Sequence, residues 1–264
     1  MKDSRVLGVA VVAGMVSMAS IALAGRPLAI DDADPVDSGQ FEFEAGAAYE
    51  HDADCKHWNF PFGLTYGLLP SVEVGAGFGG QFEERTESFE DSDTEHCIRE
   101  HGIGDLVIGA KWQFIEVCPL GARHALVPSV KLPTADDDRG LGSGKTDYDL
   151  TWIASRSICE KAGVHLNLGY SWIGRSDDDV RHYGVAMDYQ IVNAVQWVGE
   201  VFTEKELAGG TETVVQYNTG FRWNPVESLT LDIAGGSKIS GDAPDFTGTV
   251  GLTWAFGFKN NESK

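Results

Sequence analysis

Residues 125–157 read ALVPSVKLPTADDDRGLGSGKTDYDLTWIASRS, and this stretch decides the fold. From residue 147 to residue 155 polar and apolar side chains alternate, which is the period of two that belongs to β-strands. Residues 126–132 alternate in the same way, with Leu126, Val130 and Leu132 on the apolar face. Between these two arms, three aspartates are followed by three spaced glycines, a composition suited to a long solvated loop. The stretch therefore predicts a β-hairpin.

The same alternation recurs from residue 41 to residue 258 and predicts an all-β protein of about twelve strands. The connections alternate between brief ones, such as Asn193-Ala194 and Asn224-Pro225, and long acidic ones, such as residues 83–103. An even number of alternating segments with aromatic residues near their ends is typical of a transmembrane antiparallel β-barrel, with short periplasmic turns and long external loops. The apolar positions define the predicted segments 41–49, 60–66, 72–78, 106–114, 126–132, 148–154, 166–172, 183–189, 195–201, 215–223, 229–233 and 250–258.

A soluble β-sandwich is the alternative interpretation, because it also has strands and turns at regular spacing. The face opposite the apolar one is rich in glycine and small polar residues, which is unusual for a solvent-exposed face. The long loops fall on alternate connections, which a membrane explains and the wiring of a sandwich does not. Both observations favour the barrel.

The N-terminus has the features of a secretory signal peptide. Lys2 and Arg5 precede an apolar run that ends in Ala22-Leu23-Ala24, a small-x-small pattern that predicts cleavage between Ala24 and Gly25. A single transmembrane helix is the rival interpretation. The predicted organisation is a signal peptide (1–24), a periplasmic or lumen-entering segment (25–38), an outer-membrane barrel (39–258) and a C-terminal tail (259–264).

The formal net charge of −20 excludes binding of nucleic acid or an anionic surface through net charge. The predicted partners are outer-membrane lipid, lipopolysaccharide and a small-molecule solute, and the sequence fixes no oligomeric state. No cofactor, metal or catalytic residue is predicted. Gly144-Lys145-Thr146 follows a glycine-rich run, but a strand comes after it instead of the helix that a phosphate-binding loop requires.

Four cysteines fit this topology in pairs. With Gly25 in the periplasm, the connections around Cys55 and Cys97 lie outside the cell, and those around Cys118 and Cys159 lie in the periplasm. Both compartments are oxidising, so the pairings that respect the membrane are Cys55–Cys97 and Cys118–Cys159. A metal site is the alternative for the external cysteines, using neighbouring histidines; the candidate ligands are His51, Cys55, His57, His96, Cys97 and His101.

Charged residues with inward parity are predicted to line the lumen. Acids outnumber bases among them, so an aqueous path should prefer cations. A twelve-stranded barrel is intermediate in size between eight-stranded barrels, whose interiors are filled, and sixteen-stranded barrels, which enclose open channels. These inward charged residues are therefore compatible either with a salt-bridged plug or with a narrow aqueous path. The predicted lumen-lining residues are Glu42, Glu44, Asp105, Lys111, Lys131, Asp147, Asp149, Asp188, Glu200, Arg222 and Asp232.

A series of short motifs resembles the bacterial outer-membrane proteins grouped as the meta-pathway phenol-degradation, or "transporter", family. The resemblance spans most of residues 25–264, and it implies an outer-membrane barrel with a transport function. The insertion at residues 83–101 and the four cysteines depart from the family pattern. The motifs are Arg26-Pro27-Leu28, Asp31-Asp32-Ala33, Leu64-Thr65-Tyr66-Gly67-Leu68, Gly102-Ile103-Gly104-Asp105, Lys131-Leu132-Pro133-Thr134, Gly140-Leu141-Gly142-Ser143-Gly144-Lys145 and Asn167-Leu168-Gly169-Tyr170.

The sequence thus predicts a channel or transporter for passive passage of a small solute, with aromatic or hydrophobic compounds among the candidates. Energy coupling is not expected, because nothing resembles a nucleotide site. One alternative is a structural or surface-recognition barrel. A second is an outer-membrane lipid-active enzyme, for which His165 and Ser171 share a parity without any acid that could orient them.

Overall fold

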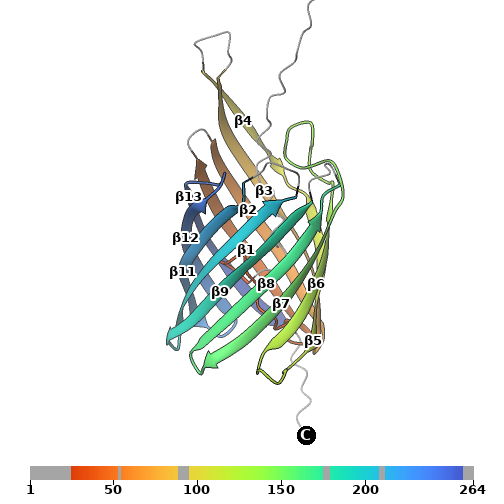
Figure 1. Ribbon diagram of the computed structural model, residues 1–264, viewed down its shortest axis with the longest axis vertical. Coiled ribbons are helices and arrows are strands. Elements are labelled where there is room, and N and C mark those ends of the chain that lie inside the picture. The colour runs from red at the N-terminus through yellow and green to blue at the C-terminus, as the bar shows by residue number, and fades with distance from the viewer. Residues whose placement is uncertain (1–24, 53–54, 89–94, 175–178, 208–211, 258–264) are drawn as a thin grey trace, which may run out of the picture.

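The computed structural model describes residues 25–52, 55–88, 95–174, 179–207 and 212–257, and the side chains of residues 85–98 are excepted (Figure 1). The predicted signal peptide (1–24) and C-terminal tail (259–264) lie outside the described residues. Within those residues, no helix is long and apolar enough to cross a membrane. The strands are β1 (Gln40–Asp52), β2 (Cys55–Leu69), β3 (Val72–Ser88), β4 (Glu95–Ile103), β5 (Leu106–Ile115), β6 (Arg123–Leu132), β7 (Asp147–Cys159), β8 (Ala162–Trp172), β9 (Val180–Val192), β10 (Val195–Glu206), β11 (Val214–Val226), β12 (Leu229–Ser240) and β13 (Phe246–Gly257).

The strands form one closed antiparallel barrel. Each strand from β5 to β13 pairs with the next, β13 pairs with β1, and the β1–β2 and β2–β3 pairings close the ring. β4 and β5 both pair with β3, β5 along Val72–Gly77 and β4 along Gly80–Ser88, so together they occupy one position in the barrel. The thirteen strands therefore fill twelve positions, and the predicted twelve-stranded antiparallel barrel is confirmed.

The prediction of a long acidic connection at residues 83–103 is wrong. β3 and β4 continue as a paired ribbon that rises above the barrel (Figure 1), with Phe82 opposite His101 and Glu84 opposite Arg99. Arg99 Nε lies 3.0 Å from Glu84 Oε2. A two-stranded ribbon outside the barrel has no apolar face to bury, so its sequence lacks the alternation that marks the other strands.

Connection lengths differ between the two ends of the barrel. At the lower end in Figure 1, the connections 160–161, 193–194 and 227–228 are tight turns. The predicted turn at Asn193-Ala194 is confirmed, whereas Asn224-Pro225 lies within β11 and the turn follows at 227–228. At the upper end the lengths are uneven: residues 133–146 form a long loop, whereas β1 and β2 close directly with Asp52 opposite Cys55. Cys55 and Cys97 therefore lie within strands, and the prediction of a long loop around each of them is wrong.

The two faces of the wall divide as the parity predicts. Large apolar and aromatic side chains point outward and are exposed, among them Trp112, Trp172, Trp223 and Trp254. The residues between them point inward and are mostly polar, and many are buried although the barrel has no continuous apolar core. This is the inverted pattern of a barrel whose outer face meets lipid.

Candidate solute pathway

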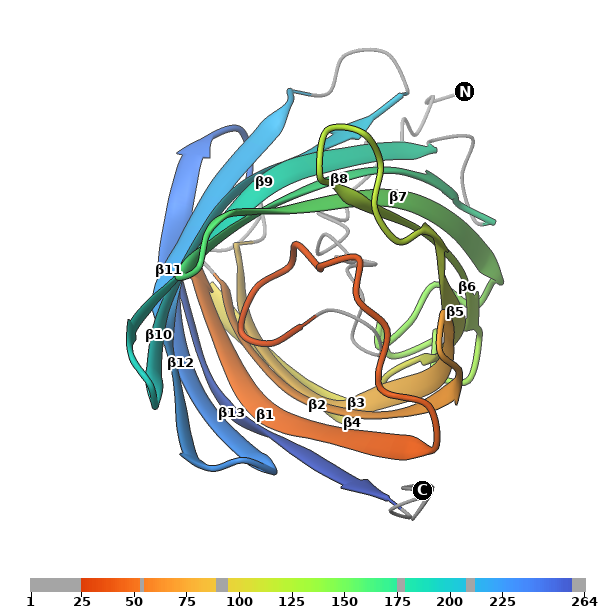
Figure 2. The same ribbon diagram turned by 90° about the horizontal axis from the view of Figure 1, so that it is seen from below.

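The N-terminal segment, residues 25–38, lies inside the barrel (Figure 2). The sequence left a periplasmic and a lumenal position open, and the structure places the segment in the lumen. It packs against the wall through two small apolar clusters on different strands. One cluster joins Leu28 and Ile30 to Ala186, Val198 and Phe202, and the other joins Ala33 to Ala125, Val127 and Ile153.

Wall side chains satisfy the backbone of the segment, which has no regular secondary structure. The N–H groups of Ala29 and Ile30 donate to the two carboxylate oxygens of Glu200, at 3.0 and 2.8 Å. Farther along the segment, the N–H of Val36 donates to Glu73 Oε2. Because buried N–H groups need acceptors, these carboxylates fix the path that the segment takes through the lumen.

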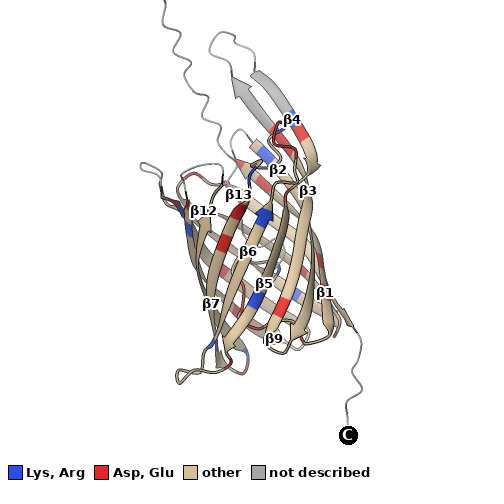
Figure 3. Ribbon diagram, turned by 90° about the vertical axis from the view of Figure 1, so that its right-hand side faces the viewer, with Lys and Arg blue, Asp and Glu red and all other residues tan. Residues whose placement is uncertain are grey.

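Two buried lysines each lie between two carboxylates. Lys111 Nζ is 2.8 Å from Asp31 Oδ2, in the N-terminal segment, and 3.5 Å from Glu73 Oε1. Figure 3 shows the basic positions of β5 and β6 among acidic positions of neighbouring strands. These ion pairs connect the N-terminal segment to the β3–β5 wall.

The second buried lysine, Lys131, holds the long upper loop. Its Nζ is 2.5 Å from Asp147 Oδ2, 3.3 Å from Asp105 Oδ2 and 2.8 Å from Ser143 Oγ. Asp105 Oδ1 also accepts hydrogen bonds from the backbone N–H groups of residues 134 and 135. Leu141, within this loop, is buried, and its carbonyl oxygen accepts a hydrogen bond from Gln81 of β3, so the loop packs against the upper end of the wall.

A serine, a histidine and an aspartate line up on β7, β8 and β9. Ser155 Oγ lies 2.8 Å from His165 Nδ1, and His165 Nε2 lies 2.7 Å from Asp188 Oδ2. Ser155 is fully buried, and its Oγ accepts a hydrogen bond from the N–H of Ala33 at 2.9 Å. The arrangement therefore holds the N-terminal segment, and the segment occupies the side from which a substrate would have to approach.

The structure does not join the pair that the enzyme alternative named. Ser171 Oγ donates to Asp149 Oδ2 at 2.7 Å, and the same oxygen lies 2.7 Å from His182 Nε2. His165 belongs to the neighbouring Ser155 group instead.

Arg26 lies against the opposite wall. Its Nε and Nη2 donate to the two oxygens of Asp232, both at 3.2 Å, and Nη2 also donates to Thr249 Oγ1 at 2.9 Å. Arg222 holds the backbone of the segment at this point by donating to the carbonyl oxygens of residues 25 and 26.

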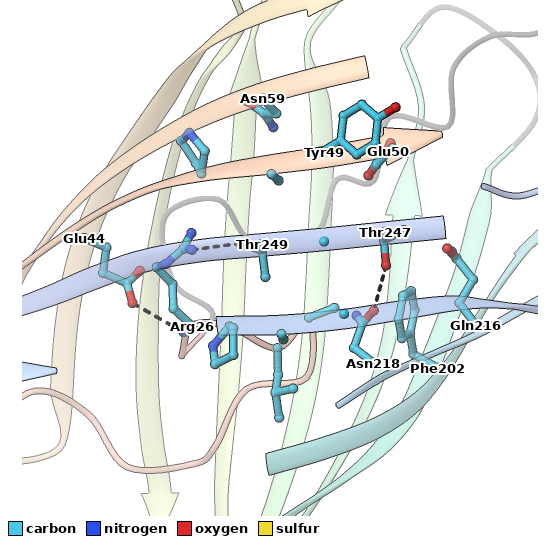
Figure 4. A pocket seen from close by; sticks show the side chains of 18 of the residues that line it. Arg26, Glu44, Tyr49, Glu50, Asn59, Phe202, Gln216, Asn218, Thr247 and Thr249 are labelled. Carbon is cyan, nitrogen blue, oxygen red and sulfur yellow. Dashed lines mark hydrogen bonds between the residues drawn. The ribbon is translucent and has the colours of Figure 1, made fainter. Parts of the chain in front are cut away.

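Two cavities lie beside the N-terminal segment. The upper one borders β1, β2 and β10–β13, and the lower one borders β1–β3, β5 and β11–β13. The upper cavity (Figure 4) has a volume of about 210 Å³, and its wall includes Asn59, Phe202, Gln216, Asn218 and Thr249. The lower cavity has a volume of about 250 Å³, and its wall includes Asp31, Glu42, Glu73, Lys111 and Arg222. Arg26 and Glu44 line both cavities and so form the partition between them.

All eleven residues predicted to line the lumen are placed on the inner face. Glu44, Asp105, Lys111, Lys131, Asp147, Glu200 and Asp232 are buried, and Glu42, Asp149, Asp188 and Arg222 are partly buried. They do not form one ring, because Lys131 lies under the upper loop, Lys111 and Arg222 line the lower cavity, and Asp232 lies against Arg26.

Sequence reasoning missed Glu73 and left open where the N-terminal segment lies. Glu73 is 2% exposed and lies between Val72 and Val74, so the same parity assigns it to the lumen. The segment has no periodicity, and its contacts come from strands far apart in the chain. Only its run of charged residues, Arg26, Asp31, Asp32 and Asp34, hinted at a polar environment.

The disulfide pairings stay predictions. Cys118 and Cys159 are unbonded thiols, in or beside turns at the lower end of the barrel. β3 lies between Cys55 and Cys97, because Cys55 is opposite Arg85 and Cys97 is opposite Thr86. Two interstrand spacings of about 4.8 Å exceed the ~7 Å that a disulfide spans, so that bond would require a rearranged ribbon. No three His, Cys, Asp or Glu side chains gather closely enough for a metal ion in the described part of the chain.

Comparisons with known proteins agree with this architecture. The sequence model of a family described as "Putative MetA-pathway of phenol degradation" matches residues 24–256. Among solved structures, the NanC porin has a TM-score of 0.57 and 9% identity, over 80% of this chain and 98% of that one. The KdgM porin has a TM-score of 0.54 and 9% identity, over 81% and 99% of the two chains.

The translocator domain of the autotransporter NalP from Neisseria meningitidis has a TM-score of 0.53 and 11% identity, over 85% of this chain and 91% of that one. No curated protein matches the sequence. At identities this low, the solved structures show a shared outer-membrane barrel fold and nothing finer.

Proposed function

The chain belongs to the family described as "Putative MetA-pathway of phenol degradation", and from this premise we propose that it is an outer-membrane channel for passive passage of a small solute. The observation that carries the proposal is the pair of cavities inside the barrel, which share Arg26 and Glu44 in their walls. A barrel that served only as a structural element would have no need of two adjoining cavities in its lumen.

The size of the cavities limits the solute. A cavity of about 150 Å³ suffices for benzene in a protein interior, so the upper cavity of about 210 Å³ accommodates one ring-sized molecule with a polar substituent. Its wall combines the apolar surfaces of Leu28 and Phe202 with the amides of Asn59 and Asn218. A small, partly apolar solute with a hydrogen-bonding group fits this lining, and the phenol named in the family description is of this kind.

Charge favours neutral and cationic solutes. Acidic residues outnumber basic residues around the lower cavity, where the acids include Asp31, Asp32, Asp34, Glu42, Glu44 and Glu73 and the bases are Arg26, Lys111 and Arg222. Carboxylates that line a narrow path raise the local concentration of cations and repel anions. We therefore expect an anion to pass less readily than a neutral or cationic compound of the same size.

The proposal includes an outer-membrane location reached through a cleaved signal peptide, with lipid and lipopolysaccharide against the outward aromatic face. Buried Ser155 beneath Ala33 supports a non-catalytic role for the lumen. Fractionation of cells and N-terminal sequencing of the outer-membrane protein test these points. Recovery in the soluble periplasm, or a retained Met1, would contradict them.

Single-channel recording of the refolded protein tests the proposed function. We expect small, steady conductance from the full chain and severalfold larger conductance after deletion of residues 26–38, because the N-terminal segment fills much of the lumen. Glu160→Gln, at an exposed position between β7 and β8, serves as the control and should conduct like the unaltered chain. If neither the full chain nor the deletion variant conducts, although both run as folded barrels on unheated gels, the channel is rejected and a structural barrel takes its place.

A further inference from the structure

The guanidinium group of Arg26 lies directly against two glycines of the barrel wall, Gly46 and Gly251, and this position is called its seat. Only glycine leaves enough room for the guanidinium there. Gly46 of β1 is the cross-strand partner of Gly251 of β13, and Gly251 is also the partner of Asp232 on β12. A Cβ atom added at either glycine would fall well inside van der Waals contact with the guanidinium group. The missing side chains let the guanidinium lie flat on the wall while it binds Asp232 in the same row.

The seat coincides with the partition between the cavities. Arg26 and Glu44 are the charged residues that line both of them, and Asp232 lies beneath Arg26 with its side chain 1% exposed. The Arg26 side chain itself is 12% exposed. A solute that moves from one cavity to the other must therefore pass along the exposed edge of this guanidinium.

We infer that Arg26 is the specificity-determining residue of the path. In its seat the guanidinium offsets the charge of Asp232 and Glu44 and leaves the passage between the cavities as wide as the wall allows. Out of its seat it carries an unpaired positive charge into the passage. This inference rests on the proposed channel function and adds to it the residue that sets charge preference and width.

Two substitutions of opposite sign separate this role from simple anchoring of the N-terminal segment. Arg26→Gln leaves Asp232 and Glu44 without their counter-charge, so the cation-to-anion permeability ratio should rise by about twofold or more. Asp232→Asn leaves Arg26 unpaired near the passage, so the ratio should fall by about as much. Anchoring alone predicts that both variants loosen the segment and change the ratio in the same direction.

A third variant tests the seat without changing any charge. Gly251→Ala places a methyl group where the guanidinium now lies, so Arg26 must move into the passage and the single-channel conductance should fall by about twofold or more. Gly235→Ala is the matched control. It also adds one methyl group to the cavity wall region, but Gly235 shares the outward parity of exposed Ile233, so the lumen keeps its shape, and the added Cβ would meet nothing closer than the Thr247 carbonyl oxygen at 3.5 Å.

The measurement is the reversal potential and conductance of refolded protein in a potassium chloride gradient, with gel mobility as the check of folding. Opposite shifts for Arg26→Gln and Asp232→Asn, together with reduced conductance for Gly251→Ala, support the inference. Equal or absent shifts in a protein that conducts would overturn it and leave the channel standing. If one charge variant fails to fold, the remaining variant and the glycine pair still decide the matter. Failure of the unaltered chain to conduct rejects the proposed function itself.

Discussion

The two sides of the lumen use the same inward positions in different ways. On the β5–β8 side, Lys111 and Lys131 are each buried between two carboxylates. The loop 133–146 covers Lys131, and the N-terminal segment covers Lys111 except where this lysine borders the lower cavity. On the β1 and β10–β13 side, the inward positions include Gly46 and Gly251, and cavities remain. The alternation of a barrel strand fixes only which residues point inward, and the size of those residues decides whether the lumen is filled.

The two sides of the lumen also contribute differently to the stability of the barrel and to the passage of a solute. Buried charges lose their hydration, so the filled side is stable only while every lysine keeps its carboxylates. The cavity side depends less on any one contact, because water can replace a lost partner there. The following variants test this division, beginning with the largest expected effect.

Lys131→Met should destabilise the barrel most. The substitution removes the charge that lies between Asp105 and Asp147 and leaves two carboxylates buried without their counter-charge, a change that typically costs about 3–5 kcal/mol. The free energy of unfolding, measured by urea titration in detergent or lipid, should fall by this amount.

Lys145→Met is the control, because Lys145 is exposed on the same loop. It should change the unfolding free energy by less than about 0.5 kcal/mol. Equal effects of the two substitutions would mean that the filled side is not held by its ion pairs, and the comparison between the two sides would fail.

The inward placement of Lys131 and Asp147 could be predicted from sequence, because a period of two assigns each residue to a face without knowledge of its neighbours. Which strands bring residues together could not be predicted. Lys111 binds Asp31 of a segment that has no periodicity, and Arg26 reaches a row of residues more than two hundred positions away in the chain. The β3–β4 ribbon was missed for a related reason, since its sequence lacks the alternation of the other strands.

Ser155→Ala should have an intermediate effect, confined to the N-terminal segment. The substitution leaves the N–H of Ala33 buried without its acceptor, which costs about 1–3 kcal/mol of docking free energy. More frequent openings to a larger conductance, and faster proteolysis within residues 25–38, should follow. Ser157→Ala, at an exposed position two residues along β7, should leave both unchanged. Unchanged openings in Ser155→Ala would show that the apolar clusters alone hold the segment.

Thr249→Val should have the smallest effect, and it tests the cavity side. Valine keeps the shape of threonine but removes the Oγ1 that accepts a hydrogen bond from Arg26 Nη2. Arg26 retains both bonds to Asp232, and the upper cavity offers room for water at Nη2, so the unfolding free energy should fall by only about 0.5–1.5 kcal/mol. The same urea titration used for Lys131→Met measures it. A loss of unfolding free energy as large as that of Lys131→Met would mean that the cavity side depends on its individual contacts as strongly as the filled side does. Its glycines would then serve the packing of Arg26 more than the passage of a solute.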